Sequence, residues 1–373
     1  MQYDDLHDPT FSATLIGWQK QHGRHTLPWQ NTRDGYLVWL SEIMLQQTQV
    51  AAVLGYYARF LERFPTVHAL AAAPVEDVMA QWSGLGYYTR ARNLHKCAQR
   101  VVAEYGGVFP ADPALLAELP GIGRSTAAAI AAFASGTRAA IMDGNVKRVF
   151  ARVFGIDTYP GERRTEEAMW RRAEALLPDR DIEAYTQGLM DLGATLCTRS
   201  SPDCHRCPMQ PRCVAYATGR VNELPVRKPK KATPEKHAAM LLLVHGGHVL
   251  LEQRPDAGIW GGLLSLPEVD GHVLADDENM PEIDQQAVAR AVQPFGVAES
   301  QERLHTVTHG FTHYKLHIAP LLITLAQRAP LAGEGRYVWM ETAAIGAAAL
   351  PAPIKKLLLA LLDTTAHAQQ RMF

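Results

Sequence analysis

Leu119-Pro120-Gly121-Ile122-Gly123-Arg124-Ser125-Thr126 separates two segments of helical character in the first half of this sequence. Asp112-Pro113 precedes it as a helix N-cap followed by proline at the first helical position, and the alanine-rich stretch 124–135 follows it and ends at Gly136. The two glycines let the backbone approach a ligand closely, and the free N–H groups at the start of the second helix suit a phosphate. We therefore predict two helices joined by a turn that binds phosphate at Gly121 and Gly123.

The composition indicates a folded chain with room for two or three domains. The 373 residues are 47% hydrophobic and include 37 Lys and Arg against 38 Asp and Glu, which argues against disorder and against a globally basic surface. The longest apolar runs, 127–134 and 238–244, are shorter than the ~18 residues of a membrane span. Residues 1–8 lack the basic and apolar segments of a secretory signal. We expect a cytoplasmic protein without membrane contact.

Helical spacing gives way to strand-like patterns beyond the middle of the chain. Residues 36–64 keep apolar side chains three and four positions apart without proline inside the repeat, which predicts one or two helices. Three prolines and four basic residues between 224 and 234 are typical of an extended linker. After it, 238–244 and 249–253 flank a His-Gly-Gly-His turn and predict a β-hairpin. The expected parts are a helical domain at 1–224, a linker at 225–234 and an α+β domain at 235–373.

Four of the five cysteines stand close together with the spacing C-x6-C-x2-C-x5-C, and they are Cys197, Cys204, Cys207 and Cys213. They follow a segment, 182–196, that predicts a helix. Because disulfides are rare in the cytoplasm, we interpret the four thiols as ligands of one metal centre. Tetrathiolate sites suit zinc as readily as an iron–sulfur cluster, so the residues alone leave both metals open.

The cysteine spacing resembles the cluster loop of the endonuclease III superfamily of DNA glycosylases, which holds a 4Fe-4S cluster. The L-P-G-x-G-R-x-T segment resembles the helix-hairpin-helix of the same superfamily, and Asp143 stands where that superfamily keeps its catalytic aspartate. The resemblance implies a multidomain protein whose all-α catalytic region grips the DNA backbone without reading its sequence. It also implies the 4Fe-4S cluster as the cofactor.

Ser125 distinguishes two branches of that superfamily. Members that also cut the DNA strand have a lysine directly after the arginine of the hairpin, and its amine attacks C1′ of the sugar. Serine cannot form the Schiff base that β-elimination requires. The chain therefore resembles the monofunctional branch, which releases the base and leaves the strand intact.

Glu42 is the second candidate catalytic carboxylate. Taken alone, one acid in the segment 41–50 favours a helix-terminal charge or a buried ion-pair partner over a catalytic group. Together with Leu27-Pro28-Trp29 and the segment 82–88, it resembles the adenine DNA glycosylases of the MutY type. That resemblance implies that Glu42, kept protonated by apolar neighbours, donates a proton to adenine N7, while Asp143 stays ionised beside the sugar.

The same resemblance assigns roles to residues near the DNA and near the flipped-out base. The matching positions are Gln47, Leu85 and Tyr87 for filling the vacated stack and probing the opposite strand, Trp29 and Gln187 for lining the adenine pocket, and Ser125 and Asn145 near the catalytic centre. For Leu85 and Tyr87, ordinary helix packing is the alternative interpretation.

The second half resembles the Nudix-like C-terminal domain of MutY-type enzymes at residues 258–263, Gly-Ile-Trp-Gly-Gly-Leu. The R-E-x-x-E-E metal-binding pattern of Nudix hydrolases is absent from the sequence, so we expect no second hydrolytic activity. Phe311, Thr312 and His313 occupy the place of a Phe-Ser-His loop that contacts 8-oxoguanine in the family. Threonine keeps the hydroxyl donor of that serine and adds a methyl group.

These features predict a monofunctional enzyme of base-excision repair that removes adenine opposite 8-oxoguanine or guanine. Its expected partner is double-stranded DNA with such a mispair, bound by a monomer at the bacterial nucleoid, and other repair proteins are further candidate partners. Two alternatives remain. One is a bifunctional pyrimidine glycosylase/lyase of the endonuclease III type, which Ser125 disfavours, and the other is a non-catalytic mismatch-binding protein in which Glu42 or Asp143 is structural.

Overall fold

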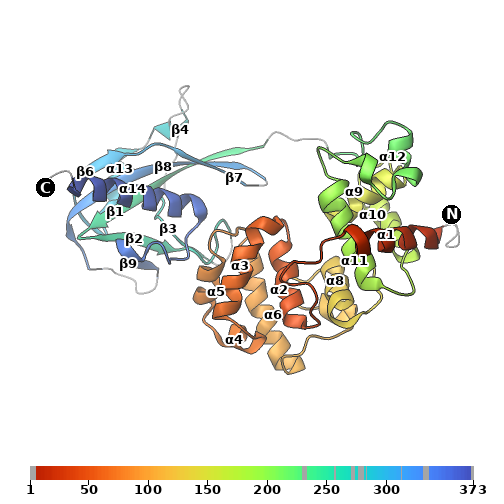
Figure 1. The fold of residues 1–373 in the computed structure, drawn as a ribbon. Helices are drawn as coiled ribbons and strands as arrows, with labels where there is room; N and C mark the ends of the chain where they lie inside the picture. Colours follow the sequence, from red (N-terminus) through yellow and green to blue (C-terminus); the bar gives the residue numbers. More distant parts are fainter. Residues whose placement is uncertain are drawn as a thin grey trace. The chain divides into compact units, whose positions relative to one another are not determined.

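A computed structural model describes residues 6–228, 233–255, 258–269, 274–275, 281–282, 284–311, 313–330 and 336–370. The chain forms two compact units, each built from two stretches of sequence, namely Met1–Ala73 with Asn93–Lys230 and Pro74–Arg92 with Lys231–Phe373 (Figure 1). The segment Pro74–Arg92 therefore groups with the C-terminal half of the chain, and the expected domain boundaries stay a prediction. Within the described ranges, no helix is long and apolar enough to cross a membrane.

The first unit is built from helices, which confirms the expected all-α region. Its helices are α1 (Pro9–His22), α2 (Gly35–Leu45), α3 (Val50–Arg63), α4 (Val67–Ala72), most of α6 (Thr89–Tyr105), α7 (Pro113–Ala117), α8 (Arg124–Ser135), α9 (Gly144–Val153), α10 (Arg163–Ala175), α11 (Ile182–Asp191) and α12 (Val214–Ala217). The segment 36–64 forms two helices, α2 and α3. The helix expected at 182–196 ends as α11 at Asp191, and a π-helical turn, Leu192–Leu196, continues it to the first cysteine of the loop.

The residues around the turn between α7 and α8 form the predicted pair of helices and the predicted glycine turn. Asp112 Oδ1 accepts a hydrogen bond of 2.8 Å from the Ala114 N–H and so caps α7. Gly121 has a φ of +80°, and a Cβ atom there would lie 3.0 Å from Asn93 Cβ, so both the backbone and the space require glycine. Helix α8 ends at Gly136, whose φ of +66° is typical of a glycine C-cap.

Helix α8 lies at the centre of this unit. Its alanines from 127 to 132 are buried, and their small side chains let α8 contact both α2 and α11 closely. Helix α1 packs against α11, and its Phe11 ring lies 5.9 Å from the Phe150 ring of α9 in an edge-on arrangement. The shared core therefore fixes α2, α9 and α11, which carry the candidate catalytic residues.

The second unit contains a seven-stranded mixed sheet with helices, which confirms the expected α+β architecture. Its elements are α5 (Val75–Trp82), β1 (Glu235–His245), β2 (His248–Gln253), β3 (Leu264–Ser265), α13 (Gln285–Val292), β6 (Gly296–Arg303), β7 (Val307–Gly310), β8 (Lys315–Arg328), β9 (Tyr337–Glu341) and α14 (Ala352–Gln370). The strand order is β3-β2-β1-β8-β6, with β7 also paired to β8 and β9 to β2. A separate pair is formed by β4 (Leu274–Ala275) and β5 (Pro281–Glu282).

Strands β1 and β2 form the predicted hairpin, with Val244 opposite Val249. Strand β1 also runs parallel to β8, from Glu235 beside Lys315 to Val244 beside Thr324. Helix α13 covers part of this sheet by packing Val288 and Val292 into a cluster with leucines of β1, β2 and β8. Strands of a parallel pair are buried on both faces when helices cover them, and the central residues of β1 are accordingly buried.

Candidate active site and cysteine loop

A cavity of about 490 Å³ opens in the first unit, and Glu42 of α2, Gln187 of α11 and Trp29 all line it. The sequence predicted a role for each of these residues in binding or protonating adenine. Cavities of this size hold small organic ligands. The structure therefore brings the candidate acid and both candidate pocket residues to one cavity.

Glu42 is half-buried, and its carboxyl makes no hydrogen bond or ion pair with any residue in the described part of the chain. Burial raises the pKa of Glu42 to about 8, and the nearby charge of Asp143 adds to the rise. A carboxyl that is withdrawn from water and has no donor to stabilise its anion keeps its proton. At neutral pH Glu42 is therefore able to act as a general acid.

Asp143 occupies the N-cap of α9. Its Oδ1 accepts from the Val146 N–H at 2.8 Å, and its Oδ2 accepts from Asn145 Nδ2 at 3.4 Å. Burial raises the pKa of Asp143 as well, while these hydrogen bonds and the positive charge of Arg148 oppose the rise. Because Asp143 has donors for its anion and Glu42 has none among the described residues, a single negative charge shared by the two carboxyls favours Asp143.

Arg148 holds this end of α9 against the π-helical turn. It donates to Asn145 Oδ1 at 2.8 Å and to the backbone oxygens of Gly193 and Cys197, both at 2.7 Å. A Cβ atom at Gly193 would lie 2.6 Å from Asn145 Cβ, so the close approach requires glycine. The sequence did not predict this role of Arg148, although its position one helical turn after Asn145 could have indicated it.

Ser125 lies in the first turn of α8, where its Oγ accepts a hydrogen bond of 2.9 Å from the Met142 N–H. Met142 directly precedes Asp143 in the chain. The serine therefore connects the start of the hairpin's second helix to the segment that leads into α9. The glycines of the hairpin lie just before it, and Gly121 and Gly123 are both exposed.

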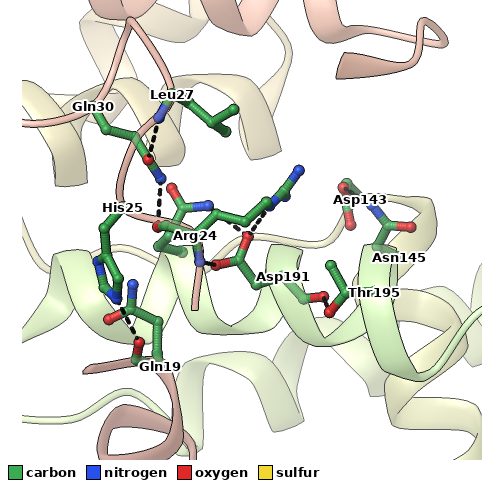
Figure 2. A network of polar contacts seen from close by, with 10 residues as sticks. Gln19, Arg24, His25, Leu27, Gln30, Asp143, Asn145, Asp191 and Thr195 are labelled. Carbon is green, nitrogen blue, oxygen red and sulfur yellow. Dashed lines mark hydrogen bonds and ion pairs between the residues drawn. The ribbon is translucent and has the colours of Figure 1, made fainter. Parts of the chain in front are cut away.

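Arg24, which lines the cavity, forms an ion pair with Asp191 of α11. Asp191 is 0% exposed and accepts hydrogen bonds from the Arg24 N–H at 2.8 Å, from Arg24 Nε at 2.7 Å and from Gln187 Nε2 at 2.8 Å. Figure 2 shows Arg24 lying along the Asp191 carboxylate, with Asp143 and Asn145 beside each other. The hydrogen bond to Asp191 orients Gln187. The Arg24–Asp191 pair was not predicted, because no local sequence pattern links residues so far apart.

Trp29 is fixed from two sides. Gln30 donates to the Arg24 oxygen at 2.9 Å and accepts from the Leu27 N–H at 3.0 Å, which holds the turn that carries Trp29 (Figure 2). The Trp29 ring also lies 5.3 Å from the Tyr57 ring, edge to face. Trp29 is therefore a rigid part of the cavity wall.

The three candidate probing residues lie in different units, Gln47 in the first and Leu85 and Tyr87 in the second. Gln47 and Tyr87 are exposed and have positive φ angles of +56° and +48°. Leu85 is only 8% exposed, whereas Tyr87 is 49% exposed. Leu85 is thus buried, and Tyr87 is the more accessible of the two.

Phe311 and His313 lie between β7 and β8, and Thr312 lies outside the described residues. Phe311 stacks on Tyr314 with ring centres 4.7 Å apart and meets His309 edge-on at 4.7 Å. His313 is exposed. The described part of this segment is therefore an aromatic cluster with one accessible imidazole.

The four loop cysteines line one cavity together with Arg152, which donates from Nη1 to Cys197 Sγ at 3.3 Å. Burial raises the pKa of Cys207 to about 12 and raises those of Cys204 and Cys213, because each thiolate would also repel its neighbours. Among the residues that the structure describes, no three metal-binding side chains surround a single ion. The four thiols thus share one cavity.

Both units match known families. Residues 40–175 match the model of the HhH-GPD superfamily of base excision DNA repair proteins, and residues 238–360 match the NUDIX domain. The chain is 32% identical over 359 residues to the adenine DNA glycosylase of Buchnera aphidicola subsp. Baizongia pistaciae, with 96% of this chain and 98% of the relative covered. It is 35% identical over 367 residues to the adenine DNA glycosylase of Mus musculus, covering 84% and 70%.

Solved structures resemble the helical half. A thermostable thymine-DNA glycosylase superposes with a TM-score of 0.51 and 30% identity, over 56% of this chain and 96% of the other. An endonuclease III trapped as a covalent intermediate with DNA superposes with a TM-score of 0.50 and 22% identity, over 59% and 99%. The second likeness is one of fold alone, whereas the sequence matches extend through both units of the chain.

Proposed function

This chain belongs to the adenine DNA glycosylases of the MutY type, and we propose that it hydrolyses the N-glycosidic bond of adenine mispaired with 8-oxoguanine or guanine in duplex DNA. The chain is an adenine-specific, monofunctional enzyme of base-excision repair, as its family membership establishes. The observation that carries the proposed mechanism is the Glu42 carboxyl, which lines a base-sized cavity with a pKa near 8 and is coupled electrostatically to Asp143.

The proposed reaction begins with adenosine turned out of the duplex into the cavity beside Trp29 and Gln187. Glu42 gives its proton to adenine N7. The bond between C1′ and N9 then breaks, its electron pair leaves with the base, and positive charge develops on the sugar. Asp143, held by the α9 N-terminus, offsets that charge. Water adds to C1′, and the proton that it loses restores the Glu42 acid.

Ser125 has no part in strand cleavage in this proposal. Its hydroxyl is engaged by the Met142 N–H, and it carries no amine that could displace the base and remain attached to the sugar. Asn145 would orient the Asp143 carboxylate and is itself oriented by Arg148. The reaction therefore ends with an abasic site in an intact strand.

We propose that Cys197, Cys204, Cys207 and Cys213 hold a 4Fe-4S cluster. The four thiols line one cavity with Arg152, which donates a hydrogen bond to Cys197 Sγ. The positive charge of Arg152 would offset the negative charge of the thiolates. Four thiols on one cavity are compatible with either a zinc ion or a 4Fe-4S cluster, and the resemblance of their spacing to the cluster loop of the endonuclease III superfamily favours the cluster. When bound, the cluster would supply a covalent cross-link for a loop that otherwise has little regular structure, together with a one-electron redox centre.

The remaining roles follow from the same proposal. Gly121 and Gly123 would bind a DNA phosphate at the start of α8, and Gln47 would enter the base stack together with Leu85 and Tyr87. The segment of Phe311, Thr312 and His313 would contact 8-oxoguanine, within a recognition domain at 235–373 that follows the linker at 225–234. With DNA as substrate, and with bacterial relatives among its matches, we place the enzyme in the cytoplasm at the nucleoid.

Single-turnover release of adenine tests the function. Duplexes with adenine opposite 8-oxoguanine, guanine or thymine are compared, and each product is analysed with and without alkali. We expect release from the first two duplexes only, with strand breaks only after alkali. Breaks without alkali would support the lyase alternative. Equal release by wild type and Glu42→Gln would remove Glu42 from the mechanism, and no release by cluster-loaded protein would support a binding protein.

A further inference from the structure

Residues 83–88 of the second unit carry Leu85 and Tyr87 in a strained backbone, and we call them the 83–88 loop. Gly84 has a φ of +96°, Gly86 of +77° and Tyr87 of +48°. No atom lies within 4 Å of a Cβ built at Gly86, so its backbone angle rather than space requires glycine. A positive φ is strained for tyrosine and persists only where neighbouring groups hold it.

Arg90, in the first turn of α6, lies beneath the 83–88 loop and is 8% exposed. Its Nη2 donates to the backbone oxygen of Leu85 at 3.3 Å and to that of Gly86 at 3.2 Å. Its guanidinium carbon lies 5.2 Å from the centre of the Trp82 ring and 5.5 Å from that of Tyr87. One buried cation therefore contacts the loop at three successive residues.

These contacts suit a guanidinium in particular. Its planar shape allows hydrogen bonds in the plane and ring contacts on the faces at the same time, which an ammonium cannot reproduce. Burial lowers the pKa of Arg90 to about 10, so the side chain is still charged at neutral pH. Trp82 adds a hydrogen bond of 3.1 Å from Nε1 to the same Gly86 oxygen.

The other side of the 83–88 loop is tied to the C-terminal part of the same unit. The Tyr88 hydroxyl accepts from the Gly84 N–H at 3.1 Å and donates to the Leu350 oxygen at 3.4 Å. Ser83 Oγ donates to that oxygen at 3.2 Å. Both ends of the loop are fixed in this way, and Arg90 and Trp82 hold its middle.

We propose that Arg90 is a positioning residue that holds the 83–88 loop in the shape with which Leu85 and Tyr87 enter duplex DNA, and so sets how fast adenine leaves the stack. The inference rests on the proposed DNA-probing role of those two residues. Arg90 touches neither the base nor the sugar in this account. It acts only through the loop that covers it.

The test measures base unstacking separately from bond cleavage. In a Glu42→Gln background, which removes the acid, 2-aminopurine is placed beside the target adenine, and its fluorescence rises when the stack opens. We expect Arg90→Met to slow this rise about tenfold and Arg90→Lys to recover part of the loss. Lys96→Met, at an exposed position of the same helix, removes one positive charge and should leave the rate unchanged.

Two further measurements separate positioning from a general loss of folding. Gly86→Ala disturbs the loop without altering Arg90, and we expect the same slow unstacking. In the Glu42 enzyme, the pH at which excision by Arg90→Met falls to half should equal that of wild type, because the acid is untouched. The excision rates of Arg90→Met and wild type are normalised to the fraction of active enzyme, measured as the amplitude of a single turnover.

A double-mutant cycle with Tyr87→Ala provides the decisive comparison. If Arg90 acts through the loop, Arg90→Met should slow unstacking by less than about twofold once Tyr87 is alanine. Fully additive losses, or an Arg90→Met rate equal to that of the Glu42→Gln parent, would overturn the inference. If Tyr87→Ala itself unstacks DNA at the parent rate, the proposed role of the loop fails, and the inference fails with it.

Discussion

The Met142 N–H donates a 2.9 Å hydrogen bond to Ser125 Oγ, so the serine that we expect in place of a strand-cutting lysine supports the segment that leads into Asp143. Asp143 follows Met142 directly and begins α9. The hydroxyl thus helps to set where the carboxylate stands, although it is too far along the chain for any local pattern to reveal the contact. Two carboxyls and one hydroxyl from α2, α8 and α9 define the candidate centre.

Replacing Ser125 with alanine should destabilise the protein and slow excision. The variant leaves the partly buried Met142 amide without its acceptor, which costs about 1–3 kcal/mol in the free energy of unfolding. Ser125→Thr retains the oxygen and is the matched control. Urea unfolding and single-turnover adenine release measure the two effects. Identical stabilities of the alanine and threonine variants would show that the hydrogen bond contributes nothing.

Replacing Glu42 with glutamine should lower the rate of adenine release at least ~10²-fold, in the range of general-acid contributions. Binding of the mispaired duplex should change little, because the substitution preserves shape. In wild type the rate should decline as the pH rises above about 8, where Glu42 loses its proton. A rate that stays level up to pH 9.5 would contradict the assignment of Glu42 as the acid.

The raised pKa of Glu42 also affects stability. Its folded pKa is about 8 and its ordinary value 4.5, so the folded state binds the proton more tightly and the stabilisation is complete below pH 4.5. It is lost as the pH rises toward 8, by at most about 1.4 kcal/mol per pH unit. Glutamine does not titrate, so the free energy of unfolding of Glu42→Gln should rise relative to that of wild type as the pH increases from 4.5 to 8. A constant difference between their unfolding free energies would argue against the shift.

The buried Arg24–Asp191 pair should matter far more than an exposed one. Asp191→Ala leaves the Arg24 side chain without its carboxylate and should cost about 3–5 kcal/mol. Glu167→Ala removes the partner of Arg163 in an exposed i,i+4 pair of α10 and should cost less than about 1 kcal/mol. Thermal and urea unfolding of both variants test this difference, which would be refuted by equal costs.

The loop cysteines should bind iron and sulfide, and Cys97 should not. We expect Cys204→Ala to lose iron, sulfide and the visible absorbance of the purified protein. Cys97→Ala, at a buried position of α6 outside the loop, should retain all three. Metal analysis and absorbance spectra decide the outcome. Stoichiometric zinc in the wild type, with neither iron nor sulfide, would replace the cluster with a structural zinc site.

Local patterns predicted local structure well in this chain. The N-cap at Asp112, the glycine stop at Gly136 and the turn before β2 each depend on a few adjacent residues, and the structure confirms all three. The raised pKa expected for Glu42 is found as well, and its causes are burial and the nearby charge of Asp143. The cap, the stop and the turn were predictable because adjacent residues determine each of them.

Contacts between distant segments could not be predicted in this way. The parallel register of β1 with β8 joins strands that no turn connects, so neither strand pattern indicates the other as its partner. The Arg24–Asp191 pair and the hydrogen bond from Arg148 to the Cys197 oxygen are equally nonlocal. The grouping of Pro74–Arg92 with the C-terminal half is a further example, since its composition resembles that of the helices around it.

The interleaving of the two units has a consequence for biosynthesis. Pro74–Arg92 leaves the ribosome early, but Gly261 and Leu350, whose backbone oxygens accept hydrogen bonds from Arg92 and Ser83, are made much later. At about 5–20 residues per second, the segment waits on the order of tens of seconds for its partners. A nascent chain arrested before Leu350 would therefore contain the 83–88 loop without the hydrogen bond that Ser83 makes in the complete fold.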